Sequence, residues 1–239
     1  MQVAPDTTTD PVVPPRESGP PPPPDGGRFC TPDAAQTFCA DFDDGILAQG
    51  WDDVGTPRGA LALVDSGARS DPFALEVLAA ETDSGYRDGP YLRKAFPGPF
   101  EELSCSIAFR HSGPFQGQKT YALLSFALLD GAEITIHLTT APVEGGLLWI
   151  FEPYDGGART VDSRRTTVGS GTTFRRIDLK FTRTSLALSV DGVPVSPLAY
   201  DQVSPITQAR FAIGAPIIDH INVQPWRAVF DDVTCTIAP

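Results

Sequence analysis

Apolar and polar residues alternate with a period of two along most of the chain after residue 29, and this pattern limits the fold more than any other feature. In the segment 102–110, ELSCSIAFR, the apolar residues Leu103, Ile107 and Phe109 alternate with small or polar ones. The segments 133–140, 174–183 and 185–190 repeat the pattern. Because successive side chains of a β-strand point to opposite faces, the alternation indicates strands with one buried face.

Turn residues separate these segments at roughly the 8–15-residue spacing of a protein built from many antiparallel strands. Asp191 and Gly192 supply the pair of positive-φ residues that a tight hairpin turn requires. The segments YALLSFALL (121–129) and GLLWIFE (146–152) are apolar on both faces, which is typical of strands at the centre of two packed sheets. Helical periodicity is nearly absent, so the sequence predicts an all-β chain with two antiparallel sheets.

Residues 1–28 differ from the rest, because they are rich in Pro, Thr and Gly and nearly free of large apolar residues. We expect a disordered Pro-rich linker of polyproline II type, which would tether the domain to a membrane anchor. The run Pro20–Pro24 leaves a proline-rich ligand for a signalling domain as the alternative. These residues contain no apolar signal-peptide segment, so we expect the export signal or anchor to be missing from the given chain. Residues 29–239 are expected to form one domain, since all-β sandwiches commonly contain about 200–250 residues.

The chain is acidic, with a net charge of −12 at pH 7 from 18 Lys and Arg residues and 30 Asp and Glu residues. Binding to nucleic acid depends on clustered Lys and Arg, so the composition argues against a nucleic-acid partner. No run approaches the ~18 consecutive apolar residues of a membrane span. Contact with a membrane is therefore expected only through an anchor missing from this chain.

The four cysteines indicate two disulfides, because they form no Cys-x-x-Cys pair and have no nearby His that would support a zinc or redox site. Cys30 and Cys39 are close enough in sequence to close a small loop at the start of the domain. Cys105 and Cys235 both fall on the apolar-facing phase of their strands, and they can bridge if these strands are neighbours or face each other across the sandwich. We predict the pairs Cys30–Cys39 and Cys105–Cys235, and with them an extracytoplasmic protein that is secreted or at the cell surface.

Several segments, taken in order, resemble one family. FCADFDDG (38–45), RRIDLKFTRTSLALSVDGVPV (175–195), RFAIGA (210–215) and WRAVFDDVTC (226–235) resemble the concanavalin A-like, laminin-G-like jelly-roll domains of exported bacterial surface proteins. The resemblance covers about residues 29–239 and implies a two-sheet antiparallel jelly-roll β-sandwich, with the first and last strands side by side in one sheet. It carries no activity by itself, because this fold hosts lectins, adhesion modules, glycoside hydrolases and lyases.

The resemblance also implies a metal position. Jelly-roll carbohydrate-binding modules often hold a structural Ca²⁺ with one acidic residue from an N-terminal Phe-acid-acid-Gly segment and one Asp from a C-terminal Asp-Asp-Val segment. In this sequence these residues are Asp43 and Asp231, with Asp44 or Asp232 as reserves. Ca²⁺ takes about 6–8 oxygen ligands, carboxylates among them. The alternative is that these aspartates accept hydrogen bonds from backbone N–H groups at strand ends.

No motif in the sequence selects a catalytic residue. The Glu-x-Asp-x-Glu strand of laminarinase-type glucanases is absent, as are Gly-x-Ser-x-Gly, His-Glu-x-x-His and a phosphate-binding loop. The nearest similarity to the glucanase strand, Glu152 followed by Asp155, has the wrong spacing. We therefore expect no catalytic residue and no enzyme activity.

Sugar sites in this fold need exposed aromatic rings flanked by polar side chains. Tyr86 and Tyr154 stand in Gly- and Asp-rich loops, and His137 and Arg110 occupy polar faces of predicted strands, so these four are the predicted ligand-binding residues. We expect a non-catalytic surface or secreted domain that recognises a polysaccharide or cell-surface glycan. One alternative is a structural or adhesion domain of a surface lipoprotein without a small-molecule ligand, and a glycoside hydrolase or lyase is the other.

Overall fold

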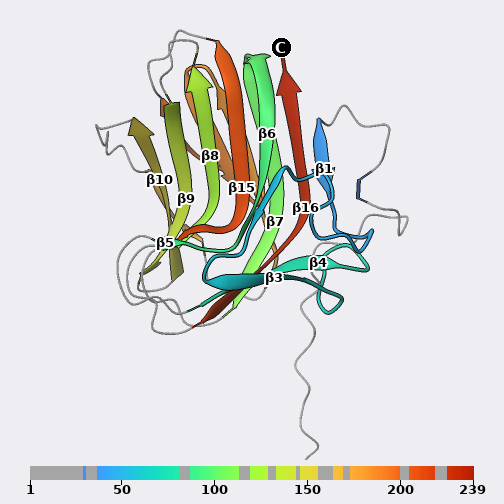
Figure 1. Cartoon of the computed structure of the whole chain (residues 1–239). Helices are drawn as coiled ribbons and strands as arrows, with labels where there is room; N and C mark the ends of the chain where they lie inside the picture. Colours follow the sequence, from blue (N-terminus) through green and yellow to red (C-terminus); the bar gives the residue numbers. More distant parts are fainter. Residues whose placement is uncertain are drawn as a thin grey trace, which may run out of the picture.

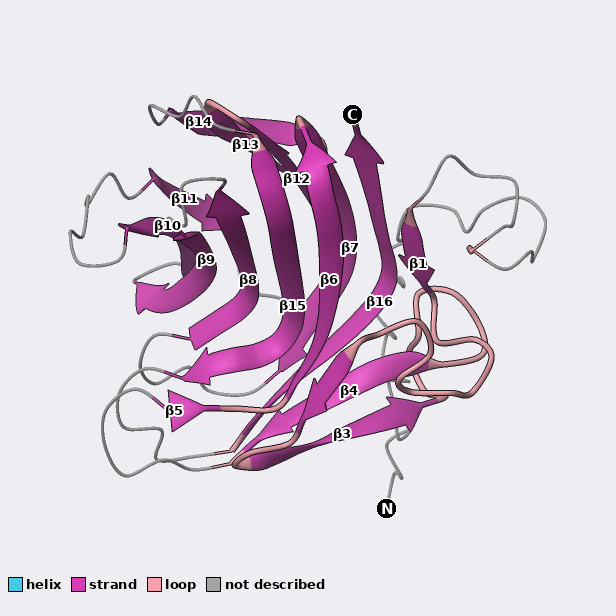
Figure 2. Ribbon diagram, turned by 45° about the horizontal axis from the view of Figure 1, so that its top comes forward, coloured by secondary structure: helices cyan, strands magenta, loops and turns pink. Residues whose placement is uncertain are grey.

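The computed structural model describes residues 29–30, 37–80, 87–112, 119–128, 133–143, 146–155, 164–168, 173–199, 205–218 and 225–239. Two antiparallel sheets pack face to face (Figure 1, Figure 2), and the regular structure of these residues is entirely β. This confirms the prediction of an all-β, two-sheet jelly-roll sandwich. No helix in these ranges is long and apolar enough to cross a membrane. The predicted linker 1–28 lies outside the described residues.

Each sheet has eight strands within the described part of the chain. Sheet A has the spatial order β14 (Val193–Ala199), β13 (Ser185–Val190), β12 (Arg175–Thr182), β7 (Glu102–Ser112), β16 (Trp226–Ala238), β4 (Ala74–Ala79) and β3 (Gly59–Val64), with β1 (Phe38–Ala40) also paired to β16. Sheet B has the order β11 (Arg164–Val168), β10 (Gly146–Asp155), β9 (Glu133–Val143), β8 (Lys119–Leu128), β15 (Ile206–Ile218), β6 (Tyr91–Phe100) and β2 (Asp53–Gly55), with β5 (Arg87–Asp88) also paired to β15. The two long C-terminal strands, β15 and β16, are thus each paired on both sides.

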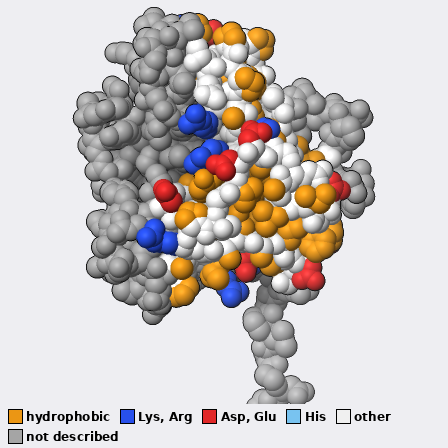
Figure 3. All heavy atoms as spheres, viewed as in Figure 1, with side chains coloured by type: hydrophobic (Ala, Val, Ile, Leu, Met, Phe, Trp, Pro, Cys, Tyr) orange, Lys and Arg blue, Asp and Glu red, His pale blue; other side chains and the backbone are white. Residues whose placement is uncertain are grey.

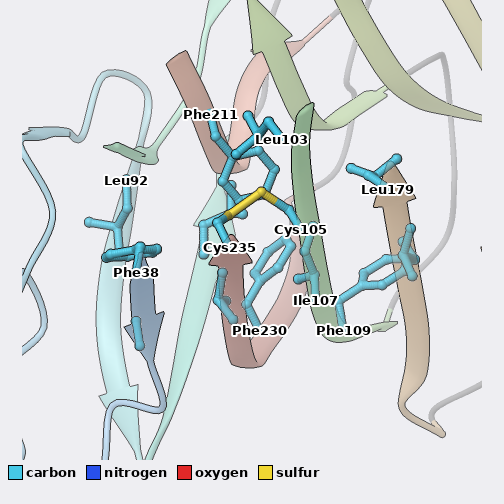
Figure 4. Packing of buried hydrophobic residues seen from close by; sticks show 14 of the residues in the cluster. Phe38, Leu92, Leu103, Cys105, Ile107, Phe109, Leu179, Phe211, Phe230 and Cys235 are labelled. Carbon is cyan, nitrogen blue, oxygen red and sulfur yellow. A yellow bond between two sulfur atoms is a disulfide. The ribbon is translucent and has the colours of Figure 1, made fainter. Parts of the chain in front are cut away.

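The core lies between the sheets and is built from the inward positions that the period-two pattern predicts. Phe109 on β7 and Phe230 on β16 are buried, and their rings stack with centroids 5.8 Å apart. Phe96 on β6 and Phe211 on β15 are buried from the opposite sheet. Figure 4 shows Phe109, Phe211 and Phe230 within this buried cluster. Burying a side chain of this size contributes about 1.5–3 kcal/mol, so this layer is the main force that holds the sheets together.

The first and last strands are neighbours, as the resemblance implies. β1 pairs antiparallel with β16, so that Phe38 stands opposite Cys235 and Ala40 opposite Val233. The pairing is extended by the backbone N–H of Thr37, which donates to the carbonyl of Cys235 at 2.9 Å. The first strand of the described residues therefore joins sheet A through the last one.

Both predicted disulfides are present. Cys30 and Cys39 are bonded with their Cα atoms 5.6 Å apart. Cys105 on β7 and Cys235 on β16 are bonded and are direct cross-strand partners within sheet A. The predicted pairing is therefore confirmed. The sequence left open whether the two strands are neighbours or face each other across the sandwich, and the structure shows that they are neighbours. Two disulfides indicate a protein that resides outside the cytoplasm.

Candidate functional site

In sheet B, β15 lies between β8 and β6 although it is far from both strands in sequence (Figure 1). His137 on β9 stands opposite Glu152 on β10. The register continues from His137 to Leu123 on β8, then to Ala212 on β15 and Arg93 on β6. We call these five positions the His137 row. Directly paired residues of neighbouring strands share a face, so the row lies on one side of the sheet.

The burial of β15 and β6 assigns this row to the outer face. On β15, Phe211 and Ile213 are fully buried, and Arg210 is exposed. On β6, Leu92 is buried, whereas the next residue along the strand, Arg93, is partly exposed and belongs to the row. Since alternate residues of a strand point to opposite faces, Ala212, the β15 member of the row, lies on the same side of the strand as the exposed Arg210, although its own small side chain is buried. The row therefore lies on the outer side of sheet B.

A second row lies two residues away from the first along each strand. Tyr154 on β10 stands opposite Thr135 on β9, which stands opposite Ser125 on β8, and Ser125 stands opposite Arg210 on β15. Three strand spacings separate Tyr154 from Arg210, which is about 14 Å. The structure therefore places two of the predicted ligand-binding residues, His137 and Tyr154, on neighbouring strands and on one face.

A built polar cluster stands at the β6 edge of this face. The guanidinium of Arg93 lies over the Tyr91 ring, 4.4 Å from its centroid, and Nη1 of Arg93 donates to Oδ2 of Asp53 at 3.0 Å. The Tyr91 hydroxyl donates to the same carboxylate oxygen at 3.1 Å. Burial raises the pKa of Tyr91, so its hydroxyl stays protonated at neutral pH. A Cβ at Gly55 on β2 would overlap the Tyr91 ring, so only a glycine at this position leaves room for the ring.

Charged side chains gather on the view shown in Figure 3. Lys and Arg side chains lie next to Asp and Glu side chains there, beside the atoms that are not described. The ion pair of Arg93 and Asp53 joins Nη1 and Oδ2 at 3.0 Å, and both side chains are partly exposed. Partly exposed pairs of this kind are worth about 0–1 kcal/mol, so Arg93 can exchange its partner for a ligand at little cost.

Arg110, the third predicted ligand-binding residue, lies on β7 of sheet A. Its Nη2 donates to the carbonyl of Gly67 at 2.9 Å, and its guanidinium lies over the Phe174 ring, 5.2 Å from the centroid. Arg110 holds the segment 65–73 between β3 and β4, which we call the β3–β4 loop. The structure therefore does not bring Arg110 together with His137 and Tyr154. Tyr86, the fourth predicted residue, lies outside the described residues.

The two Phe-Asp-Asp segments meet at the β3–β4 loop. The buried carboxylate of Asp231 accepts hydrogen bonds from the backbone N–H groups of Arg69 at 2.8 Å, Ser70 at 3.1 Å and Asp232 at 2.9 Å. Burial, reinforced by the negative charge of Asp232, raises the pKa of Asp231 to about 7. These contacts agree with the alternative that the aspartates accept backbone hydrogen bonds.

Asp43 contacts the same loop from the first segment. Its Oδ1 accepts a hydrogen bond from the backbone N–H of Phe73 at 3.4 Å, and its Oδ2 is buried without a partner among the described residues. Burial is the largest cause that raises the pKa of Asp43 to about 6, and the charge of Asp41 adds to it. In the part of the chain that the structure describes, no group of three His, Cys, Asp or Glu side chains is arranged to hold a metal ion. Calcium at Asp43 and Asp231 stays a prediction.

Comparison with known proteins adds to this geometry. No protein-family model matches the chain, and no curated protein matches it in sequence. The cellulose-induced protein Cip1 has a similar structure, with a TM-score of 0.54 and 11% identity over 83% of this chain and 96% of Cip1. An alginate lyase, A1-II′, has a TM-score of 0.54 and 11% identity over 74% of this chain and 83% of the lyase.

A third similar structure is a carbohydrate esterase from Shiga toxin-encoding bacteriophage phi24B, with a TM-score of 0.50 and 13% identity over 85% of this chain and 99% of the esterase. At such identities the similarity shows the fold alone. The fold is a jelly-roll β-sandwich, consistent with the concanavalin A-like resemblance.

These similarities correct the function predicted from the sequence. The expectation of a non-catalytic binding domain does not stand, because the solved structures that resemble this chain include an alginate lyase and a carbohydrate esterase, so the fold is compatible with a carbohydrate-active enzyme. The physical reason is that a missing motif excludes only a site built from one continuous segment. The His137 row draws its polar positions from β6, β9 and β10, which no local motif records. Sequence reasoning did not single out Arg93 or Arg210, and it considered Glu152 only for the spacing of a glucanase strand.

Proposed function

We propose that this protein is a carbohydrate-active enzyme that cleaves a uronate-containing polysaccharide by β-elimination on the outer face of sheet B. The observation that carries the proposal is the His137 row, which puts His137 and Glu152 opposite each other and Arg93 in the same row. The structural similarity to an alginate lyase supports the proposal to the extent that this fold can carry such an activity.

His137 is the candidate base. An imidazole is ordinarily neutral and able to accept a proton near pH 7. The proton to be removed sits on the carbon next to the carboxylate of the uronate ring. Cross-strand partners have Cα atoms about 4.5–5.5 Å apart, and Glu152 is the cross-strand partner of His137, so we assign it the role of stabilising the charge of the imidazolium that forms.

Arg93 and Arg210 supply positive charge on the same face. A guanidinium that pairs with the substrate carboxylate stabilises the negative charge that spreads onto that group when the proton leaves. Tyr154 is the candidate acid, because a phenol with an ordinary pKa of about 10 is protonated at neutral pH. The C5 proton goes to His137, the bond from C4 to the bridging oxygen breaks, and that oxygen takes a proton from Tyr154. A C4–C5 double bond forms, and no water or co-reactant is consumed.

The protein is proposed to act outside the cytoplasm, secreted or at the cell surface, with a polysaccharide as its partner. The two disulfides support this location, because such bonds persist in oxidising compartments. A high-molecular-weight polysaccharide is also met outside the cell, so the location and the substrate class agree.

The test is an assay of the full chain with alginate, following the ultraviolet absorbance of the unsaturated product. We expect turnover in the wild type, a loss of at least about 100-fold for His137→Ala, and a smaller loss for Arg210→Ala. Arg227→Ala is the matched control, because Arg227 is an exposed arginine on sheet A, paired only loosely with Glu76 at 3.5 Å. No turnover of alginate, pectate or a glucuronan by the folded, disulfide-bonded protein would refute the proposal, as would full activity of His137→Ala.

A further inference from the structure

The outer face of sheet A, opposite the His137 row, carries a groove with a volume of about 380 Å³. It crosses β16, β7, β12, β13 and β14, and we call it the hydroxyl groove. Its outward-facing lining consists of Ser104, Ser106, Arg176, Asp178, Lys180, Ala187, Ser189, Pro194, Thr234 and Thr236. Ligand pockets commonly have volumes of about 300–1,000 Å³, so the groove is large enough for a small ligand or a segment of a chain.

Hydroxyl groups form a regular array on the floor of the groove. Ser106 stands opposite Thr234, and Ser104 stands opposite Thr236, across β7 and β16. On the other side of β7, Ser106 stands opposite Asp178 of β12. Side chains at alternate positions of paired strands repeat at about 7 Å along a strand and about 4.8 Å across strands. The Ser104 hydroxyl donates to Glu102 at 3.0 Å and the Ser189 hydroxyl donates to Asp178 at 3.2 Å, so these serines offer acceptor lone pairs to a ligand. The hydroxyls of Thr234 and Thr236 can donate as well as accept, so the array suits a polyhydroxylated ligand.

The charges in and beside the groove are already balanced. Nε of Arg176 donates to Oδ1 of Asp178 at 2.9 Å, and Nζ of Lys180 lies 2.7 Å from Oε2 of Glu102. Burial acts to raise the pKa of Asp178, but the hydrogen bonds from Arg176 and from the hydroxyls of Ser106 and Ser189 outweigh it and hold this pKa below its usual range. A polyanion would meet both carboxylates, so the balance of charge favours a neutral ligand.

The rim adds small apolar surface. Pro194 is exposed and Ala187 is half-buried, and both line the groove. Neither side chain projects far, so the groove stays open above the sheet. The C–H face of a sugar ring can rest on such surface while its hydroxyls bond to the floor.

From these observations we infer that the hydroxyl groove is a second carbohydrate-binding site, which takes a segment of a neutral glycan. It lies on the opposite outer face from the proposed reactive row and differs from it in charge, since Arg93 and Arg210 stand on the other face. The inference does not depend on the proposed β-elimination.

The test is titration of the full chain with cellohexaose, xylohexaose and laminarihexaose, followed by amide chemical shifts in NMR. We expect saturable binding of at least one of these neutral oligosaccharides, with the largest shifts at β7, β12 and β16. Ala187→Trp fills the groove from an open position, and the double variant Ser104→Ala/Thr236→Val removes hydroxyls with little change in volume. Each should weaken binding by about tenfold or more.

Two controls keep the result specific. His137→Ala should bind the neutral oligosaccharide as the wild type does, so a failure of the proposed lyase activity leaves this result unchanged. Non-reducing peptide maps and thermal melts establish that each variant is folded. No saturable binding of the three oligosaccharides, unchanged affinity in both groove variants, or tighter binding of an alginate hexasaccharide in this groove would overturn the inference.

Discussion

Cys105 and Cys235 are direct partners across β7 and β16, with their Cα atoms 4.1 Å apart. The bond therefore joins two neighbouring strands of sheet A and does not cross the core. It also closes the longer of the two disulfide loops, with a sequence separation of 130 residues, against 9 for Cys30–Cys39.

Removal of the long disulfide should cost more stability than removal of the short one. In the loop-entropy description, closing the long loop restricts the unfolded chain by about 5 kcal/mol, and closing the short one by about 2.5 kcal/mol. We expect Cys105→Ala/Cys235→Ala to lower the free energy of unfolding more than Cys30→Ala/Cys39→Ala, as measured by urea denaturation. Equal losses would show that the long disulfide stabilises the protein through local contacts and not by restricting the unfolded chain.

The stability of the protein should carry a pH dependence from Asp231. Its folded pKa, about 7, is raised above the ordinary value of 3.8 by burial and by Asp232. A raised pKa gives a contribution that is fully present below about pH 4 and is lost as the pH rises through about 7. Asp231→Asn cannot ionise, so the melting temperature of the wild type relative to this variant should fall from pH 4 to pH 8. A constant difference across this range would contradict the assignment.

Gly67→Ala should destabilise the protein more than Gly192→Ala. Both glycines have positive φ, +73° and +77°, so each alanine carries a backbone cost of about 1–2 kcal/mol. A Cβ at Gly192 meets open space, while one at Gly67 would lie 2.6 Å from Nη2 of Arg110 and displace it from the Gly67 carbonyl. We expect an additional loss of about 1 kcal/mol for Gly67→Ala in chemical denaturation. Equal losses would show that the Arg110 contact contributes nothing.

Gly55→Val should disturb the edge of the proposed reactive face. The new side chain overlaps the Tyr91 ring, so the ring moves and carries with it the Arg93 guanidinium stacked on it. Overpacking of this kind costs about 1–3 kcal/mol. Val54→Ala on the same strand is the control, because Val54 is exposed. If Gly55→Val and the control had equal melting temperatures, β2 would be able to shift without cost, and Gly55 would not position the Tyr91 ring.

The strands and the disulfides could be predicted from the sequence because both depend on local alternation. Cys105 has the same phase as the buried Leu103 and Ile107, and this phase decides which way the sulfur points. The pairing of the β9–β10 hairpin, which sets His137 against Glu152, is also short-range in the chain. A search for cross-strand partners within that hairpin could have found this pair.

The remaining part of the candidate site depends on long-range pairing. β15 lies between β6 and β8 although more than 70 residues separate it in sequence from either strand. Arg93 and Arg210 reach the same face only through that arrangement, and period-two alternation does not say which strands become neighbours. For the same reason, the meeting of Arg110 and Asp231 at the β3–β4 loop could not be read from the sequence.

The pairing of β1 with β16 has a mechanical consequence. A pulling force applied before Cys30 passes through the Cys30–Cys39 bond directly into β1, and the intervening residues bear no load. From β1 the load enters β16 through backbone hydrogen bonds, and β16 is covalently joined to β7. Tension on the N-terminal side is thus delivered to the centre of sheet A, so the domain can stay folded until the β1–β16 contact itself ruptures.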